Sequence, residues 1–409
     1  MTNRLYYTNP QLHEFESVVE DILPPSGAEN RHGVILRETA FYPTSGGQVF
    51  DTGWLTAGAQ DRVRVAEVAE MEDGRIVHYL EAPAKVAPGE VLRGNIDAER
   101  RRDHMQQHSG QHVLSAAFIE LYQVPTVSFH MGEDYCSIDL TTPSLSAKQI
   151  EGAERRANEI VFENRPVTIR FVSRVEAETL GLRKLPPAER DELRLIEVAD
   201  FDLSACGGTH VSATGQIGSI LLRKTETVRQ GMRVEFVCGG RAVRTARRDY
   251  GALSESANLF STQLWDVPEQ IRKTFEETKS VRKQREEALE ELAGAMASAA
   301  LSDQPEKNGR KVVVRQFDDR DTSFAKLFAQ RVARAGVPAV ALVASTMDPA
   351  GVIFAQAAGG VGDMGVLLKQ ILATVGGRGG GTRDFAQGGL PTGTDVKRLL
   401  EEAMGTIEG

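Results

Sequence analysis

The sequence contains no apolar run close to the roughly 20 residues that a helix needs to cross a bilayer. Its N-terminal segment, MTNRLYYTNPQLHEF, also lacks the apolar core and the small-residue cleavage site of a secretory signal. We therefore expect neither a membrane span nor export, and the cytoplasm is the expected compartment.

Cysteine is scarce, because Cys136, Cys206 and Cys238 are the only three in 409 residues. Three widely separated thiols cannot build a disulfide framework, which agrees with a reducing compartment. Cys136 and Cys238 lie in apolar, strand-like segments and are expected to be small buried side chains. Cys206 differs from them, because glycine, threonine and histidine follow it.

An excess of positive charge is also missing, since the formal net charge is −9. A negative net charge argues against indiscriminate nucleic-acid binding, but a local stripe of basic residues is compatible with a negative net charge. Two such stripes are candidates for RNA contact, Arg100, Arg101 and Arg102 in one and Arg241, Arg244, Arg247 and Arg248 in the other.

The chain does have enough hydrophobic residues, 41%, to bury more than one core. Residues 1–95 predict short antiparallel strands, with alternation in HGVILRETAF and a hairpin turn at Asp73-Gly74. These strands predict a small β-barrel or sandwich, and we expect the N-terminal β-barrel in this part of the chain.

Residues 96–250 mix helix and strand patterns, so we expect an α+β fold class. Asp97 is the predicted N-cap of one long helix, AERRRDHMQQHSGQHVLSAAFIELY. Ser146 and Gln149 form a predicted capping box for a second helix. Strands are expected at VTIRFV, LRLIEV, SILLRKT and RVEFVCG, with a hairpin in TVSFHMGEDYCSIDL.

The remaining chain divides into two predicted parts. Residues 251–305 are almost all helix formers, and Pro268 interrupts them, so we expect a helical hairpin linker with its apolar stripes packed inside the molecule. Residues 306–409 alternate apolar strands with helices and predict a C-terminal α/β domain. The run GGRGGG at residues 376–381 is the one low-complexity segment, and a flexible linker is one interpretation of it.

Two short clusters have the spacing of metal ligands: HSGQH at His108–His112 and CGGTH at Cys206–His210. Residues four apart on a helix lie on one face, so two imidazoles can reach one zinc ion. His104 precedes His108 by four and repeats the spacing, but a single ion cannot reach both His104 and His112. The residues alone leave the pairs 104/108 and 108/112 open.

These clusters, together with TAFYPTSGGQVFDTGW, resemble the editing domain of alanyl-tRNA synthetase and the free-standing alanyl-tRNA editing proteins. MRVEFVCGGRA and GGGTRDFAQGG are similar to the long form of those proteins, which ends in a DHHA-type domain. The resemblance covers nearly the whole chain. It implies a trans-editing deacylase that removes serine from tRNA(Ala), with glycine as a second candidate amino acid.

The resemblance also implies roles for particular residues. It assigns zinc to His108, His112, Cys206 and His210, and contact with a seryl hydroxyl to Thr39. The synthetase has a Gln-Lys-Gly stretch where this chain has His130-Met131-Gly132, so His130 is either a substrate-facing donor or a rim residue. By the same resemblance, Arg378 and Arg383 of the glycine-rich segment are expected to contact tRNA.

Ester hydrolysis needs an oriented water and donors for an oxyanion, and glycine-rich loops can bring backbone amides to such a site. Gly207 and Gly208 are candidate oxyanion donors. Gly46, Gly47 and Gln48 are candidates to approach the acyl group. An alternative that shares these features is a zinc-stabilised tRNA-binding module without catalysis, and a homodimer through the helical or C-terminal region is compatible with either.

Overall fold

The structure is a computed structural model that describes residues 1–26, 31–58, 61–83, 85–182, 192–229 and 231–408. The chain separates into two compact units, Met1–Glu255 and Ser256–Gly409. None of the helices formed by the described residues is both long and apolar enough to cross a membrane.

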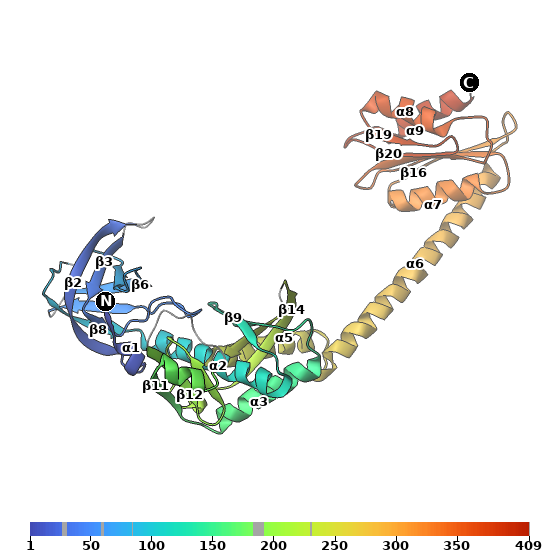
Figure 1. The fold of residues 1–409 in the computed structure, drawn as a ribbon. Coiled ribbons are helices and arrows are strands. Elements are labelled where there is room, and N and C mark those ends of the chain that lie inside the picture. Colours follow the sequence, from blue (N-terminus) through green and yellow to red (C-terminus); the bar gives the residue numbers. More distant parts are fainter. Residues whose placement is uncertain (27–30, 59–60, 84, 183–191, 230, 409) are drawn as a thin grey trace. The chain divides into compact units, whose positions relative to one another are not determined.

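The first unit begins with a closed six-stranded barrel in the order β2-β3-β7-β6-β5-β8 (Figure 1). Its strands are β2 (Glu14–Ser26), β3 (Arg31–Leu36), β5 (Gly53–Ala57), β6 (Asp61–Glu70), β7 (Ile76–Leu80) and β8 (Val91–Ile96). Three short elements accompany them, β1 (Asn3–Arg4), α1 (Leu5–Thr8) and β4 (Glu38–Thr39). The predicted turn is confirmed, because β6 and β7 are antiparallel and Gly74 has φ +78°. A β-barrel was therefore a correct expectation.

Helix α2 (Ala98–Tyr122) follows the barrel and has the predicted bounds and N-cap, with the Asp97 side chain accepting a hydrogen bond from the N–H of Arg100. Its residues are buried on all sides from Gln107 to Phe118, whereas Arg102 near its start is exposed, so most of α2 is a central helix and not an amphipathic surface helix. Helix α3 (Ala147–Phe162) packs against α2 and starts with the predicted Ser146–Gln149 capping box.

Two antiparallel sheets surround α2. The first has the order β14-β15-β10-β9, with β9 (Thr126–Met131), β10 (Cys136–Leu140), β14 (Ile220–Val228) and β15 (Gly231–Cys238). The second joins β11 (Val167–Ser173), β12 (Glu192–Val198) and β13 (Asp202–Ala205). The short helices α4 (Arg174–Thr179) and η1 (Thr214–Ile217) connect these strands.

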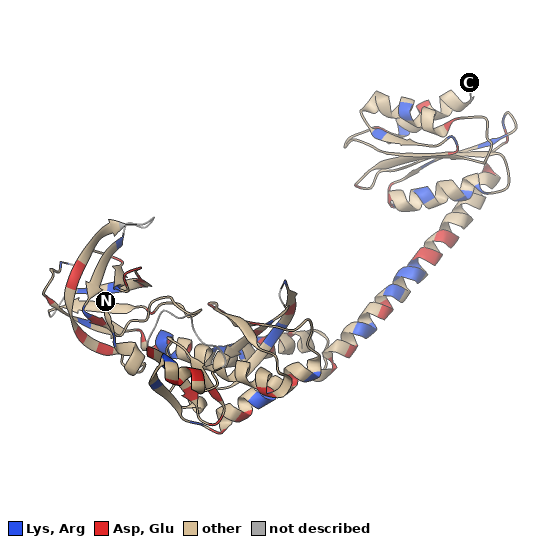
Figure 2. Ribbon diagram, viewed as in Figure 1, with Lys and Arg blue, Asp and Glu red and all other residues tan. Residues whose placement is uncertain are grey.

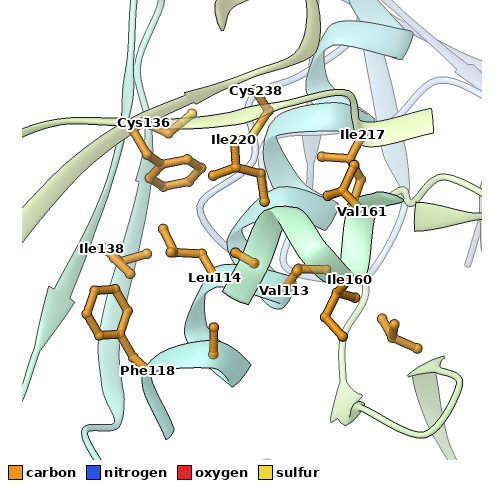
Figure 3. Packing of buried hydrophobic residues seen from close by; sticks show 14 of the residues in the cluster. Val113, Leu114, Phe118, Cys136, Ile138, Ile160, Val161, Ile217, Ile220 and Cys238 are labelled. Carbon is orange, nitrogen blue, oxygen red and sulfur yellow. The ribbon is translucent and has the colours of Figure 1, made fainter. Parts of the chain in front are cut away.

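The core between the first sheet and the helices is apolar (Figure 3). Leu114 and Phe118 of α2 meet Ile138 of the sheet, and Ile160 of α3 closes the layer. Cys136 and Cys238 belong to this core with no exposed surface, which confirms the expectation of buried structural thiols.

Two helices connect the first unit to the last part of the chain, α5 (Gly239–Leu259) and α6 (Val267–Asp303), with the short η2 (Leu264–Asp266) before α6. Pro268 stands in the first turn of α6, where its missing N–H costs nothing, so the predicted interruption of the helical segment is confirmed. The apolar stripe differs from the prediction. Phe275 and Val281, two apolar residues of this 37-residue helix, are 70% and 61% exposed.

The second unit contains a five-stranded sheet in the order β16-β17-β18-β20-β19. Its strands are β16 (Lys311–Phe317), β17 (Ala339–Ser345), β18 (Gly351–Gln356), β19 (Arg378–Gly381) and β20 (Phe385–Gly389). The C-terminal end of α6 and α7 (Thr322–Ala333) pack on one face of the sheet, and α8 (Met364–Val375) and α9 (Val396–Glu408) pack on the other (Figure 1).

The last four residues of the GGRGGG run form the edge strand β19, so this part of the run is not a flexible linker. A Cβ on Gly379 would lie 2.5 Å from Cα of Gly388, and one on Gly381 would lie 2.2 Å from the carbonyl oxygen of Phe385. The glycines therefore permit close backbone packing of β19 on β20.

Candidate metal centre

Four side chains from two distant segments converge in the first unit. His108 and His112 come from one face of α2, and Cys206 and His210 come from the loop after β13. One donor atom from each lies within 4.8 Å of the others. Sγ of Cys206 is 3.4 Å from Nε2 of His108 and 3.3 Å from Nε2 of His210. The four form a mostly buried cluster able to hold a metal ion.

Each imidazole of the cluster is oriented through its Nδ1 atom. Nδ1 of His108 is 2.8 Å from Oε1 of Gln48, and Nδ1 of His112 is 3.3 Å from Oδ2 of Asp202. Nδ1 of His210 is 3.1 Å from Oγ of Ser109, which also accepts a hydrogen bond from the N–H of Val211. The side-chain oxygens of Gln48 and Asp202 offer acceptors to Nδ1 of His108 and His112, which favours the tautomer that carries its lone pair on Nε2.

The electrostatics of the cluster favour the thiolate form of Cys206. Burial by itself raises the pKa of the Cys206 thiol, but His108 and His210 outweigh it and hold that pKa well below its ordinary value. Burial lowers the pKa of His210 to about 3. A thiolate and neutral imidazoles are the forms that bind metal ions.

The CGGTH loop is held in place by contacts of its backbone. A Cβ on Gly208 would lie 2.2 Å from Cε1 of His108, so glycine is required for this approach. Arg194 of β12 donates to the carbonyl oxygens of Cys206 at 2.6 Å and Gly208 at 3.0 Å. Its Nη2 is buried without a hydrogen-bond partner among the described residues.

The loop that precedes β5 of the barrel closes over the other side of the cluster. Gln48 is fully buried, and its Nε2 donates to Oγ1 of Thr209 at 2.8 Å. The N–H of Met131 donates to the carbonyl oxygen of Gly47 at 3.2 Å, and a Cβ on Gly47 would strike Phe129. The Phe129 ring lies 5.4 Å from the His108 ring, centroid to centroid. Gly46 has φ +56° and open space around it.

Several residues expected at the site have other positions or partners. The N–H of Gly208 donates to Sγ of Cys206 at 3.3 Å, so this amide serves the sulfur and is not aimed at an oxyanion. Gln48, expected to approach the substrate, uses its side chain to orient His108 instead. His130 of β9 is exposed, with Nε2 3.3 Å from Oγ of Ser128 and 3.8 Å from Oδ2 of Asp139.

Thr39 lies inside the barrel and has no exposed surface. Its hydroxyl is 2.8 Å from Nε2 of His78 and accepts a hydrogen bond from the N–H of Phe41 at 3.1 Å. The hydroxyl expected to contact a seryl substrate is therefore occupied within the barrel.

The candidate pairs on α2 are also distinguished. His104 is buried but does not belong to the cluster, and its Nδ1 has no hydrogen-bond partner among the described residues.

In the second unit, Arg378 and Arg383 are exposed, and Nη2 of Arg383 donates to the carbonyl oxygen of Gly360 at 3.3 Å.

The sequence did not identify the residues that orient the ligands, above all Asp202, Ser109 and Arg194. A signal existed for each: an acid four residues before Cys206, a serine between the two histidines of α2, and a charge inside the apolar strand LRLIEV. The sequence does not show which group each of these residues contacts, because most of the contacted groups are far away in the sequence.

Comparison with known proteins gives matches along most of the chain. Residues 10–100 match the family described as tRNA synthetases class II (A). Residues 193–234 match the threonyl and alanyl tRNA synthetase second additional domain, and residues 308–409 match the DHHA1 domain.

Individual relatives agree with these matches. The alanine–tRNA ligases of Halorubrum lacusprofundi and Methanosarcina mazei are 35% and 34% identical over 98% and 100% of this chain. The chain spans less than half of these relatives, 44% of each. The alanyl-tRNA editing protein AlaX-L of Pyrococcus horikoshii is 30% identical over 95% of this chain and 94% of its own length.

Proposed function

The chain belongs to the family of the long-form alanyl-tRNA editing proteins, and we propose that it is a deacylase that hydrolyses the ester of mischarged tRNA(Ala). The observation that carries this proposal is the cluster of His108, His112, Cys206 and His210, with every imidazole held through Nδ1. The inferred substrates are tRNA(Ala) carrying serine or glycine.

The donor set of the cluster fits zinc. Three imidazole nitrogens and one thiolate are typical zinc ligands, and a tetrahedral ion with sulfur at about 2.3 Å and nitrogen at about 2.0–2.1 Å holds S and N about 3.6 Å apart. The observed S–N separations are 3.3 and 3.4 Å. A zinc ion bound by all four residues would supply a fixed positive charge that organises the loop and orients the substrate.

The chain's own groups must supply the rest of the chemistry. HSGQH has no glutamate to act as a general base, so the activating group for water is not on this helix turn. We place the oxyanion donors at the N–H of Gly207 and at Nη2 of Arg194, because neither has a hydrogen-bond partner among the described residues. The Gly46–Gly47 turn forms the wall opposite the CGGTH loop.

Selection of serine over alanine requires a partner for the seryl hydroxyl. A site that hydrogen-bonds this hydroxyl can discriminate by about 10⁴ to 10⁵, because its polar groups are otherwise left unpaired. Thr39 can take this role only by giving up its bond to His78. Exclusion of glycine is weaker, because one missing methyl is worth only about 1 to 3 kcal/mol.

The deciding experiment incubates the purified protein with Ser-tRNA(Ala), Gly-tRNA(Ala), Ala-tRNA(Ala) and Ser-tRNA(Ser). We expect rapid release of serine, slower release of glycine, and no release of alanine from tRNA(Ala). Release that disappears on chelation and returns with zinc would connect the cluster to turnover. Tight binding of tRNA(Ala) without release of any amino acid would instead indicate a zinc-stabilised binding module.

Further parts of the proposal concern the whole chain. We assign residues 1–95 to the barrel, 96–250 to the editing domain, 251–305 to a helical linker and 306–409 to a tRNA-binding domain that uses Arg378 and Arg383. We also propose a cytoplasmic homodimer through the helical or C-terminal region, because the apolar residues of α6 are exposed. Light scattering in solution tests the dimer.

A further inference from the structure

Charge alone does not mark a further site on the first unit. Basic and acidic residues are intermixed along its helices and strands (Figure 2). Two arginines of the stripes expected to contact RNA are engaged inside the protein. Arg101 is fully buried and paired with Asp51, and Arg241 is 6% exposed and paired with Asp103. Incomplete hydrogen bonds are a better guide, because a donor without an acceptor is costly unless a ligand supplies one.

Helix α1 places Tyr7 against the CGGTH loop of the metal centre. The carbonyl oxygen of Tyr7 accepts a hydrogen bond from Nε of Arg194 at 2.9 Å. The Arg194 guanidinium also lies over the Tyr7 ring, with its carbon 5.4 Å from the ring centroid. A Cβ on Gly207 would lie 3.4 Å from the hydroxyl oxygen of Tyr7. The Tyr7 hydroxyl is therefore a neighbour of the residue that follows the ligand Cys206.

Three hydrogen-bond donors meet at this point without an acceptor among the described residues. The hydroxyl oxygen of Tyr7 accepts a hydrogen bond from Nη1 of Arg4 at 2.9 Å, so its own proton is directed elsewhere. The N–H of Gly207 and Nη2 of Arg194 have no partner either. We call the Tyr7 hydroxyl, the Gly207 N–H and Nη2 of Arg194 the donor cluster.

The donor cluster suits an oxygen atom that carries negative charge. Two guanidinium groups face the Tyr7 ring, because Arg4 lies 5.3 Å from its centroid on top of the Arg194 contact. The hydrogen bond from Arg4 polarises the Tyr7 hydroxyl and strengthens it as a donor, and an ion pair with Glu70 holds Arg4 in place. Gly207 is exposed, so a ligand can reach the cluster from solvent.

We propose that Tyr7 is a catalytic residue whose hydroxyl donates a hydrogen bond to the carbonyl oxygen of the aminoacyl ester. Water forms a bond to the carbonyl carbon, and the π electron pair moves onto the carbonyl oxygen, which the donor cluster then binds. Return of that pair breaks the bond to the ribose oxygen, which takes up the proton that the water loses. The Tyr7 proton stays on the tyrosine throughout.

This inference rests on the proposed function, which assigns the oxyanion to Gly207 and Arg194. It adds a third donor from the N-terminal segment, 187 positions away from Arg194 in the sequence. The barrel domain would then supply part of the catalytic machinery and not only a support for the metal centre.

The substitution Tyr7→Phe tests the proposal, because phenylalanine keeps the ring beside Arg194 and removes only the hydroxyl. With the zinc-loaded full-length protein and Ser-tRNA(Ala), kcat should fall by about 100- to 1,000-fold, the usual effect of losing one oxyanion donor. KM and metal content should stay within about twofold, because the bond strengthens only in the transition state. Tyr6→Phe is the matched control, since the hydroxyl of Tyr6 is buried without a partner among the described residues, and its kcat should equal that of the wild type.

Two substrate analogues separate this role from a structural one. A phosphonate analogue of serine esterified to the 3′ oxygen of adenosine carries a permanent tetrahedral anion, whereas 3′-serylamido-3′-deoxyadenosine keeps a neutral carbonyl. Tyr7→Phe should weaken binding of the phosphonate by about 10- to 100-fold and binding of the amide by less than about twofold. Gly207→Ala should behave in the same way, because its methyl group fits beside Tyr7 but fills the space of the oxyanion.

The outcomes distinguish the inference from the proposed function. An unchanged kcat in Tyr7→Phe, an equal loss of affinity for both analogues, or an equal loss of activity in Tyr6→Phe would overturn the role of Tyr7. A wild-type protein that binds the phosphonate through Tyr7 but releases no amino acid would reject only the deacylase function.

Discussion

The first unit contains two buried histidine sites that differ in how their nitrogen atoms are used. In the barrel, Nδ1 of His78 donates to the carbonyl oxygen of Val34 at 3.0 Å, and Nε2 accepts from the hydroxyl of Thr39 at 2.8 Å. In the metal centre each Nδ1 is bound, but the Nε2 atoms of His108 and His210 face only the sulfur of Cys206.

This difference separates a structural histidine from a ligand. Both sites are buried, and burial lowers the pKa of His78 to about 4 and that of His210 to about 3. Burial and a shifted pKa therefore do not distinguish them. What distinguishes them is that the hydrogen bonds of His78 are complete, whereas those of the cluster leave converging lone pairs that a metal can satisfy.

The largest effect is expected for Cys206→Ala. Removal of a ligand should abolish metal binding and lower deacylation by more than about 100-fold, because even an outer partner of a ligand is worth about 10- to 100-fold. Metal analysis and single-turnover hydrolysis measure the two effects. Cys136→Ala removes a buried thiol outside the cluster and should keep the metal. Full activity in a demonstrably metal-free sample would contradict the assignment.

His104 and His108 lie four residues apart on α2, and we expect their replacement to have different effects. His108→Ala should lose metal and most activity, whereas His104→Ala should keep the metal and lose far less activity, because only His108 belongs to the cluster. The same metal analysis and hydrolysis assay apply to both. The reverse order would show that the pair 104/108 binds the ion.

Removing an orienting partner should have an intermediate effect. Asp202→Asn keeps the shape but removes the charge beside Nδ1 of His112, so metal affinity should fall by about 10- to 100-fold. Competition with a chelator measures the change. Asp200→Asn, an exposed acid two residues away, is the control, and equal affinities for both variants would deny Asp202 its role.

We expect the substitution Thr39→Val to lower the stability of the first unit. Thr39→Val leaves Nε2 of His78 without its donor, so the free energy of unfolding should fall by about 1 to 3 kcal/mol, as denaturant titration would show. Hydrolysis of seryl and glycyl esters should change in parallel. A selective loss of seryl hydrolysis would instead identify Thr39 as the group that contacts the seryl hydroxyl.

The smallest effect is expected in the second unit. The guanidinium of Arg378 has no hydrogen-bond or ion-pair partner among the described residues, whereas that of Arg383 is bound to Gly360. Arg378→Ala should weaken binding of full-length tRNA by about two- to fivefold at low salt and lower the salt slope by about 1. Arg383→Ala should change the slope less. Equal slopes for wild type and both variants would remove these residues from the interface.

Local signals explain which parts of the molecule could be predicted. Helix α2 has the expected bounds because its N-cap and its helix-forming residues lie in one continuous segment of the sequence. The same holds for the Ser146 capping box. The edge strand β19 was missed, because its glycines carry no strand pattern and owe their place to the close approach of β20.

The candidate site divides in the same way. Spacing within HSGQH and CGGTH indicated a metal site but left the pairs 104/108 and 108/112 open, and only the resemblance to the editing proteins implied the four ligands. The contact of Gln48 with His108 and Thr209 could not be predicted, because it joins residues 60 and 161 positions apart. The hydrogen bond between the Thr39 hydroxyl and His78 could not be predicted either, because these residues are far apart in the sequence and no single motif contains both.

The bond between Gln48 and Thr209 has a consequence for how the protein folds. It joins segments 161 positions apart, so the chain entropy of a long loop must be lost before the contact forms. The turn of α2, the loop that contains Gln48 and the CGGTH loop can each form before they meet. The four ligands and their hydrogen-bond partners come together only when all three segments are in contact. Capture of a metal ion by all four ligands in a refolding experiment therefore reports that these three segments have already met.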